Sequence, residues 1–195
     1  AILYSVKAVN ELICWTAGSG SIVRRTTDGG TTWTDGNPNW GVISGTINNI
    51  DAIDANNAWV ATNVSVSTVI YKTSNAGNNW IQVYSQTGGF INGINMVSTT
   101  NGFAFGSPIA NIWTILVTTN GGLNWTQHPL APQAQIAESG FRNSFQVSLP
   151  FMWFGSFLGS VYRTTNNGVN WTFHPTPGIL TYIFALHFNS NTIGL

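Results

Sequence analysis

The stretch Thr26-Thr27-Asp28-Gly29-Gly30-Thr31-Thr32-Trp33, here called the octet, is the motif around which the whole chain is organised. The octet returns three times, and its four tryptophans stand 47, 45 and 46 residues apart. A period of that size is typical of an array of supersecondary units. The other three copies are Thr73-Ser74-Asn75-Ala76-Gly77-Asn78-Asn79-Trp80, Thr118-Thr119-Asn120-Gly121-Gly122-Leu123-Asn124-Trp125 and Thr164-Thr165-Asn166-Asn167-Gly168-Val169-Asn170-Trp171.

Each octet is predicted to be a tight turn between two antiparallel strands, because a short apolar run precedes it. The Asp or Asn at its third position can accept bonds from backbone N–H groups ahead of it. The Gly at its fifth position allows a positive φ, and the Trp covers apolar surface at the foot of the hairpin. The predicted structural turn residues are Asp28, Gly30, Trp33, Asn75, Gly77, Trp80, Asn120, Gly122, Trp125, Asn166, Gly168 and Trp171.

The spacing predicts an all-β fold, because each period holds about four short strands and no helical periodicity. Such units are the blades of a β-propeller, each made of four antiparallel strands. We expect one β-propeller region over residues 1–195, with full repeats at about 1–46, 47–90, 91–142 and 143–179 and a partial fifth at 180–195. The incomplete fifth unit predicts an arc, completed either within a larger propeller or by another molecule. Unpaired sheet edges of such an arc favour further pairing.

The amino-acid composition limits the classes of partner that the chain is expected to bind. Only 6% of the residues are charged and the net charge is zero, so nothing marks a nucleic-acid or anionic-lipid surface. Asn and Thr, 23 of each, supply the polar surface instead. A net charge near zero also leaves self-association unopposed. The apolar run at 149–162 is interrupted by Pro, Gly and Ser, so we expect no membrane span, and no signal peptide is visible.

Catalysis is not indicated. A glycosidase needs two carboxyl groups about 5–10 Å apart. The candidates are scattered, and Asp51 and Asp54, three apart on one strand, should point to opposite faces. His128 and His174 occupy the same position in neighbouring repeats, too far apart to share a zinc ion. We therefore expect no catalytic residue, no metal and no cofactor. The acidic candidates are Glu11, Asp28, Asp35, Asp51, Asp54 and Glu138.

The loops between strands form the predicted contact surface, at 35–47, 63–68, 85–91, 107–112 and 127–143. Four aromatic residues lie in or beside them and are the candidates for facing a protein or a glycan. The competing interpretation for each is burial between blades. The four are Trp40, Phe90, Trp113 and Phe141.

The octets resemble the Asp-box, or bacterial neuraminidase repeat, whose pattern is Ser/Thr-x-Asp-x-Gly-x-Thr-Trp. Three of the four octets carry Asn in place of Asp. The longer phrase, a strand ending in Arg or Lys followed by Thr-Thr-Asn-Gly-Gly-x-Asn-Trp, is similar to the photosystem II stability/assembly-factor type of propeller. Related repeats occur in secreted bacterial proteins, sortilin-type receptors and xyloglucan-hydrolysing glycosidases. The resemblance implies a propeller over the whole chain, with the octets as structural turns remote from ligand sites.

The sequence thus favours a non-catalytic, secreted or surface-exposed propeller that binds a protein or glycan through its loop face. Two alternatives stay open. The first is a self-assembling, filament-type structural protein whose copies join through open sheet edges. The second is a sialidase-like or xyloglucanase-like polysaccharide hydrolase with no evident active site.

Overall fold

The computed structural model describes residues 1–39, 42–176 and 182–188. Over these residues the chain forms four antiparallel sheets of four strands each, and the strands of each sheet follow one another in chain order. This confirms the predicted all-β fold of four-stranded blades. None of the described residues forms a helix long and apolar enough to cross a membrane.

Sheet one contains β1 (Leu3–Ala8), β2 (Cys14–Gly18), β3 (Val23–Thr26) and β4 (Thr34–Asp35), with a 3-10 turn, η1 (Ser19–Ser21), between β2 and β3. Sheet two contains β5 (Thr46–Ala52), β6 (Ala58–Val64), β7 (Ser67–Thr73) and β8 (Ile81–Thr87). Sheet three contains β9 (Ile91–Met96), β10 (Gly102–Ile109), β11 (Ile112–Thr118) and β12 (Thr126–Gln127). Sheet four contains β13 (Gly140–Ser148), β14 (Phe151–Ser156), β15 (Ser160–Thr164) and β16 (Thr172–Pro175).

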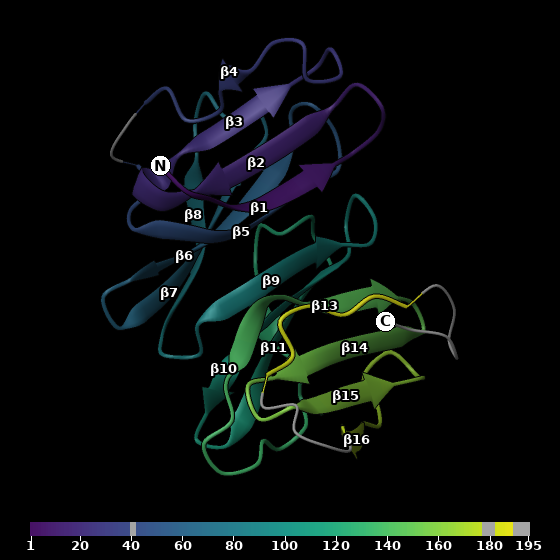
Figure 1. The fold of residues 1–195 in the computed structure, drawn as a ribbon. Helices are drawn as coiled ribbons and strands as arrows, with labels where there is room; N and C mark the ends of the chain where they lie inside the picture. The colour runs from purple at the N-terminus through teal and green to yellow at the C-terminus, as the bar shows by residue number, and fades with distance from the viewer. Residues whose placement is uncertain (40–41, 177–181, 189–195) are drawn as a thin grey trace.

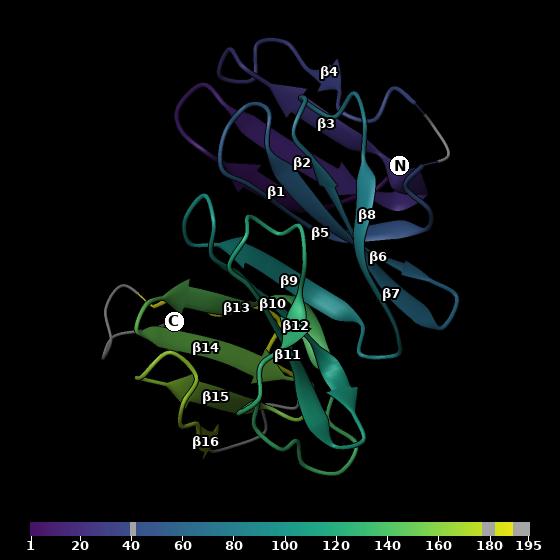
Figure 2. The same cartoon turned by 180° about the vertical axis from the view of Figure 1, so that it is seen from behind.

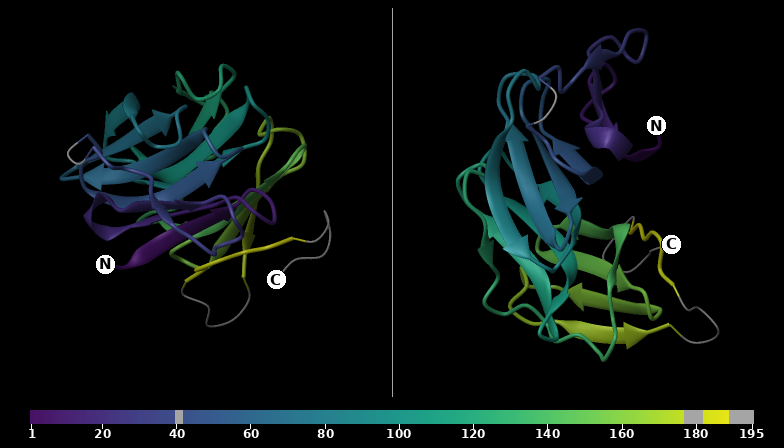
Figure 3. Two further views of the ribbon diagram at one scale, coloured as in Figure 1. Left: turned by 90° about the horizontal axis from the view of Figure 1, so that it is seen from above. Right: turned by 90° about the vertical axis from the view of Figure 1, so that its left-hand side faces the viewer.

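The sheets stack face against face in chain order, with sheet one and sheet four at the two ends of the row (Figures 1 and 2). Their first strands are neighbours, since β1 lies against β5, β5 against β9 and β9 against β13. The row is open rather than closed into a ring: the side view shows sheet one as its end (Figure 3).

The octets adopt one shared turn. The first Thr accepts a hydrogen bond from the Gly N–H at position five, as in Gly30 N to Thr26 Oγ1 at 2.9 Å. The third residue accepts from the backbone N–H at position seven, as in Thr32 N to Asp28 Oδ1 at 2.9 Å. Glycine is required in the second octet because a Cβ at Gly77, whose φ is +85°, would come within 2.0 Å of the Gly36 carbonyl oxygen. The same Thr–Gly bond recurs at Thr73–Gly77, Thr118–Gly122 and Thr164–Gly168.

The core consists of three apolar clusters, one at each interface between successive sheets. The cluster between sheets one and two holds Trp15, Val60 and Trp80, all nearly inaccessible to solvent. Burying side chains of this size is the main favourable term in folding, about 1.5–3 kcal/mol for a Val or Leu. Sheet stacking is therefore what stabilises the row.

Polar side chains of the inner strands join sheet one to sheet two and sheet two to sheet three. Asp51 Oδ2 on β5 accepts a 2.6 Å bond from Met96 N on β9, and its Oδ1 lies 2.7 Å from Lys7 Nζ on β1. Asn49 Oδ1 accepts from Ile94 N at 2.8 Å in the same manner. A buried acceptor that meets a backbone N–H in this way fixes the registration of neighbouring sheets.

Residues 182–188 lie against the outer face of sheet four. Gln146 Oε1 accepts a 2.6 Å bond from Phe188 N, and Gln146 Nε2 donates to Phe188 O at 2.9 Å. The Phe188 ring stacks on Trp153 with centroids 4.5 Å apart. This segment belongs to the predicted partial fifth unit, and its remainder at 189–195 is outside the described residues.

Candidate functional site

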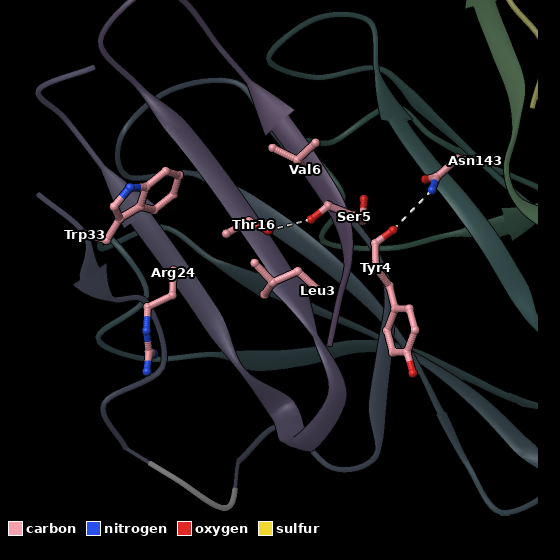
Figure 4. A pocket seen from close by; sticks show the side chains of 8 residues that line it. All are labelled: Leu3, Tyr4, Ser5, Val6, Thr16, Arg24, Trp33 and Asn143. Carbon is pink, nitrogen blue, oxygen red and sulfur yellow. Dashed lines mark hydrogen bonds between the residues drawn. The ribbon is translucent and has the colours of Figure 1, made fainter. Parts of the chain in front are cut away.

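The outer face of sheet one carries exposed apolar side chains and lines a depression of about 820 Å³. Leu3 and Val6 on β1 are 54% and 69% exposed, and Trp33 at the end of the first octet is 44% exposed. They lie beside Thr16 of β2 and Arg24 of β3 (Figure 4). We call this surface the sheet-one face, formed by Leu3, Val6, Thr16, Arg24 and Trp33.

Strand register shows what covers the matching face elsewhere in the row. Val6 pairs with Thr16, which pairs with Arg24. In sheet two the equivalent paired residues are Ile50, Val60 and Tyr71, and in sheet three they are Ile94, Ala104 and Leu116. Those six side chains are all buried, because the preceding sheet packs on them. In sheet one, no described residue takes that place.

The chemistry of this face also differs from that of its counterparts. Arg24 stands where sheets two and three carry the buried Tyr71 and Leu116. Its guanidinium pairs with Asp35 Oδ1 at 3.0 Å, and both side chains are about one-third exposed. The sheet-one face is therefore apolar along β1 and charged along β3 and β4. A surface of this mixed kind suits a partner with its own apolar strip and polar rim.

The exposure of the octet tryptophans shows the same difference between sheet one and the sheets that follow it. Trp80 and Trp125 are 4% and 5% exposed, against 44% for Trp33. The Trp80 indole is held in place by a 2.9 Å bond from its Nε1 to the carbonyl of Gly36, the residue directly after β4. Trp33 has the same place in its own turn and no described sheet against it.

The edge of the sheet-one face reaches sheet four. Asn143 Nδ2 on β13 donates a 3.2 Å bond to the Tyr4 carbonyl, and Asn143 Oδ1 accepts from Asn49 Nδ2 at 2.9 Å. The Arg142 guanidinium lies over the Tyr4 ring, 4.2 Å from its centroid. The inner strands of sheets one, two and four thus meet beside this face (Figure 4).

Of the four predicted binding aromatics, the structure brings two together, Phe90 and Phe141. Phe90 is 37% exposed, and it lines a second depression of about 570 Å³ together with the half-buried Phe141. Trp113 is 2% exposed and packs edge-on against Phe154 and Tyr162 between sheets three and four, so its side chain is part of the core. Trp40 lies outside the described residues.

The two buried acids of the predicted hydrolase alternative both take part in structural contacts. Burial raises the pKa of Asp51, an effect that the Lys7 ammonium partly offsets. Glu138 Oε1 accepts from Ser156 Oγ at 2.7 Å, and Oε2 accepts from Gln135 N at 2.8 Å and from the Tyr162 hydroxyl. Burial, together with the Glu138 carboxylate, raises the pKa of the Tyr162 phenol. These groups hold sheets and loops together.

The histidines also have local structural contacts. His128 Nδ1 accepts a 3.2 Å bond from Leu130 N, and burial lowers the pKa of the ring. His174 Nε2 lies 2.9 Å from Thr172 Oγ1 on its own strand. Neither arrangement resembles a metal site.

The sequence profile of the family described as "Photosynthesis system II assembly factor YCF48" matches residues 2–147, three-quarters of the chain. The chain belongs to this family. The sequence resemblance to photosystem II assembly-factor propellers is thereby confirmed. A comparison with curated protein sequences gave no match.

Solved structures share the fold of this YCF48-family chain. The GH74 enzyme of Niastella koreensis superposes with a TM-score of 0.64 at 22% identity, over 94% of this chain and 25% of the enzyme. The GH74 xyloglucanase of Xanthomonas campestris gives 0.62 at 13% identity, over 92% and 31%. A structure described as YCF48 bound to D1 peptide gives 0.52 at 12% identity, over 100% and 89%. The chain therefore spans about a quarter of the Niastella enzyme, and identities this low show the fold alone.

Proposed function

We propose that this chain is a non-catalytic propeller that scaffolds or recruits another protein, and that the partner docks on the sheet-one face. The observation that carries the proposal is the exposure of Trp33 beside Leu3 and Val6, where the equivalent side chains of sheets two and three are buried. Contiguous exposed apolar groups with a polar rim are typical of protein interaction sites.

The partner that fits is an extended polypeptide segment, apolar where it crosses β1 and polar where it meets Arg24 and Asp35. Two observations support this choice. Residues 182–188 already cover the opposite end of the row as an extended segment, held through Gln146 and stacked on Trp153. A structure of the family member YCF48 is described as bound to a D1 peptide.

A display library of unstructured peptides, selected on the purified chain, tests the proposal. The selected peptides are then titrated against Val6→Asp and against Ile81→Asp, which alters another exposed strand aliphatic, on β8. Because Val6 would be desolvated on binding, we expect Val6→Asp to weaken binding at least about tenfold. Ile81→Asp should bind as the wild type does.

Three results would overturn the proposal. These results are a library that yields no binder, binders that tolerate Val6→Asp, and binders that are lost equally with Ile81→Asp. Sedimentation of the free chain is the companion measurement, since a dimer that Val6→Asp dissolves would make a second copy the occupant and remove the peptide partner.

The proposal includes secretion or display at the cell surface, as the sequence resemblance implies. Fractionation of cells that express the gene from its native start site tests this part. Recovery in the medium or on the surface is expected, and confinement to the cytosol would contradict it.

A further inference from the structure

A second depression opens where the inner parts of sheets two, three and four meet, and it encloses about 570 Å³. That volume is within the range of small-molecule sites. Three asparagines, Asn48 on β5, Asn63 on β6 and Asn92 on β9, are prominent in its polar lining. Ser107, Ser139 and Arg142 complete that polar lining. Phe90, Phe141 and Phe184 supply its aromatic lining. We call it the amide pocket, after the three asparagines.

Two of the amides have polar atoms without a partner. Asn48 is 2% exposed, and its Nδ2 is buried with no hydrogen-bond partner among the described residues. Asn63 Oδ1 is likewise buried and unpartnered within the described part of the chain. Buried polar atoms are nearly always satisfied in folded proteins. An unmatched donor and an unmatched acceptor in one pocket therefore indicate a ligand that supplies both.

A local irregularity in β5 sets the direction of the Asn48 side chain. The pairing of β5 with β6 shifts register between Ile47 and Asn49, so Asn48 is the extra residue of a β-bulge. Bulges redirect a side chain and are common beside binding sites. On the far side, Gly140 leaves room for the Asn92 amide, because a Cβ there would come within 2.6 Å of Asn92 Nδ2.

Aromatic rings line the same pocket beside the amides. Phe184 is 64% exposed and packs on Phe141 with ring centroids 4.7 Å apart, and Phe90 is 37% exposed. Exposed rings of this kind offer flat apolar faces to a ligand. None of the described lining residues is acidic, and the one cation, Arg142, already stacks on Tyr4.

We propose that the amide pocket binds a neutral saccharide. Sugar hydroxyls donate and accept at once, and so complement the free Asn48 donor and the free Asn63 acceptor. The C–H face of a pyranose ring is apolar and packs against Phe184 and Phe90. No acidic group in the described lining favours a cation, and a neutral sugar leaves the Arg142 guanidinium in its place over the Tyr4 ring. This site is separate from the sheet-one face and does not depend on it.

The test uses chain made in bacteria, because Asn63 begins an Asn-Val-Ser sequon that must stay unglycosylated. Neutral cello-, manno-, xylo- and N-acetylchito-oligosaccharides are titrated by calorimetry, with sialyllactose as the charged comparison. We expect a neutral oligosaccharide to bind, and both Asn48→Ala and Phe184→Ala to weaken it about tenfold or more. Phe173→Ala, which removes another exposed aromatic ring, on β16 and outside the pocket lining, should have no effect.

Phe184→Ala keeps the test decisive if Asn48→Ala fails to fold, since the Phe184 ring is mostly exposed. The proposal is overturned if no neutral sugar binds at millimolar concentration, or if sialyllactose binds more tightly. It is also overturned if binding survives Phe184→Ala unchanged in a folded variant.

Discussion

The indole Nε1 of Trp80 donates a 2.9 Å hydrogen bond to the carbonyl oxygen of Gly36, and this bond joins the second octet to the end of sheet one. The contact combines a buried aromatic ring with a satisfied buried donor. Trp33 occupies the same octet position and is 44% exposed. The buried Trp80 therefore stabilises the fold, whereas the exposed Trp33 is available to a binding partner.

Truncating these two tryptophans should therefore have unequal effects. We expect Trp80→Ala to lower the free energy of unfolding by about 3–5 kcal/mol, as for other buried aromatics. Trp33→Ala should change it by less than about 1 kcal/mol, because the ring is exposed. Denaturant unfolding measures both, and equal losses would contradict the inequality.

The Asp28 carboxylate should respond to acid. Hydrogen bonds from the Thr32 hydroxyl and backbone N–H, and then from the Thr26 hydroxyl, lower its pKa to about 2 from an ordinary 3.8. A lowered pKa means that its contribution to stability is present above about pH 4 and is lost as the pH falls through about 2. Carboxyl-detected NMR titration should find this pKa. In Asp28→Asn, which reproduces the other three octets, that part of the acid sensitivity should vanish. A normal Asp28 pKa would refute the bonding scheme.

Asp51 is expected to act as an acceptor rather than as a catalyst. Asp51→Asn keeps an oxygen for Met96 N, whereas Asp51→Ala leaves that buried N–H unsatisfied, at a cost of about 1–3 kcal/mol. In thermal unfolding, the melting temperature of Asp51→Asn should therefore be well above that of Asp51→Ala. If both unfold alike, the bond to Met96 contributes nothing to the joint between sheets two and three.

The Tyr162 phenol should resist ionisation. Burial raises its pKa above the usual 10, and the hydrogen bond and charge of Glu138 raise it further. Ultraviolet titration of the wild type should therefore show one tyrosine ionising later than the others. Glu138→Gln removes the like charge and should bring that transition to lower pH. An unchanged transition would mean that Glu138 does not face the phenol.

The repeat carried most of the fold prediction. Four octets at even spacing predict four hairpins, because Gly and Asn in fixed places leave the chain few other turns. The octet alone could not predict that one tryptophan stays exposed, since Trp33 and Trp80 have the same local sequence pattern. Their difference arises from what lies beyond the sheet, which is a tertiary property.

The candidate sites were harder to predict. Trp113 lies beside a predicted loop, yet β11 turns its ring into the core against Phe154. An alignment of the repeats could have singled out Arg24 on the sheet-one face. At the same distance before the octet, the second and third repeats carry Tyr71 and Leu116 in place of a charged residue. The amide pocket had no signal, because Asn48, Asn92 and Phe184 come together only when three sheets stack.

Fluorine NMR of the 5-fluorotryptophan-labelled chain tests directly whether the sheet-one face receives a protein partner. Trp33→Phe and Trp80→Phe assign the two resonances. On addition of a peptide selected from the library, we expect the Trp33 resonance to shift and to lose its solvent isotope effect, while the Trp80 resonance stays in place. A Trp33 resonance that is unmoved at saturating peptide would contradict it.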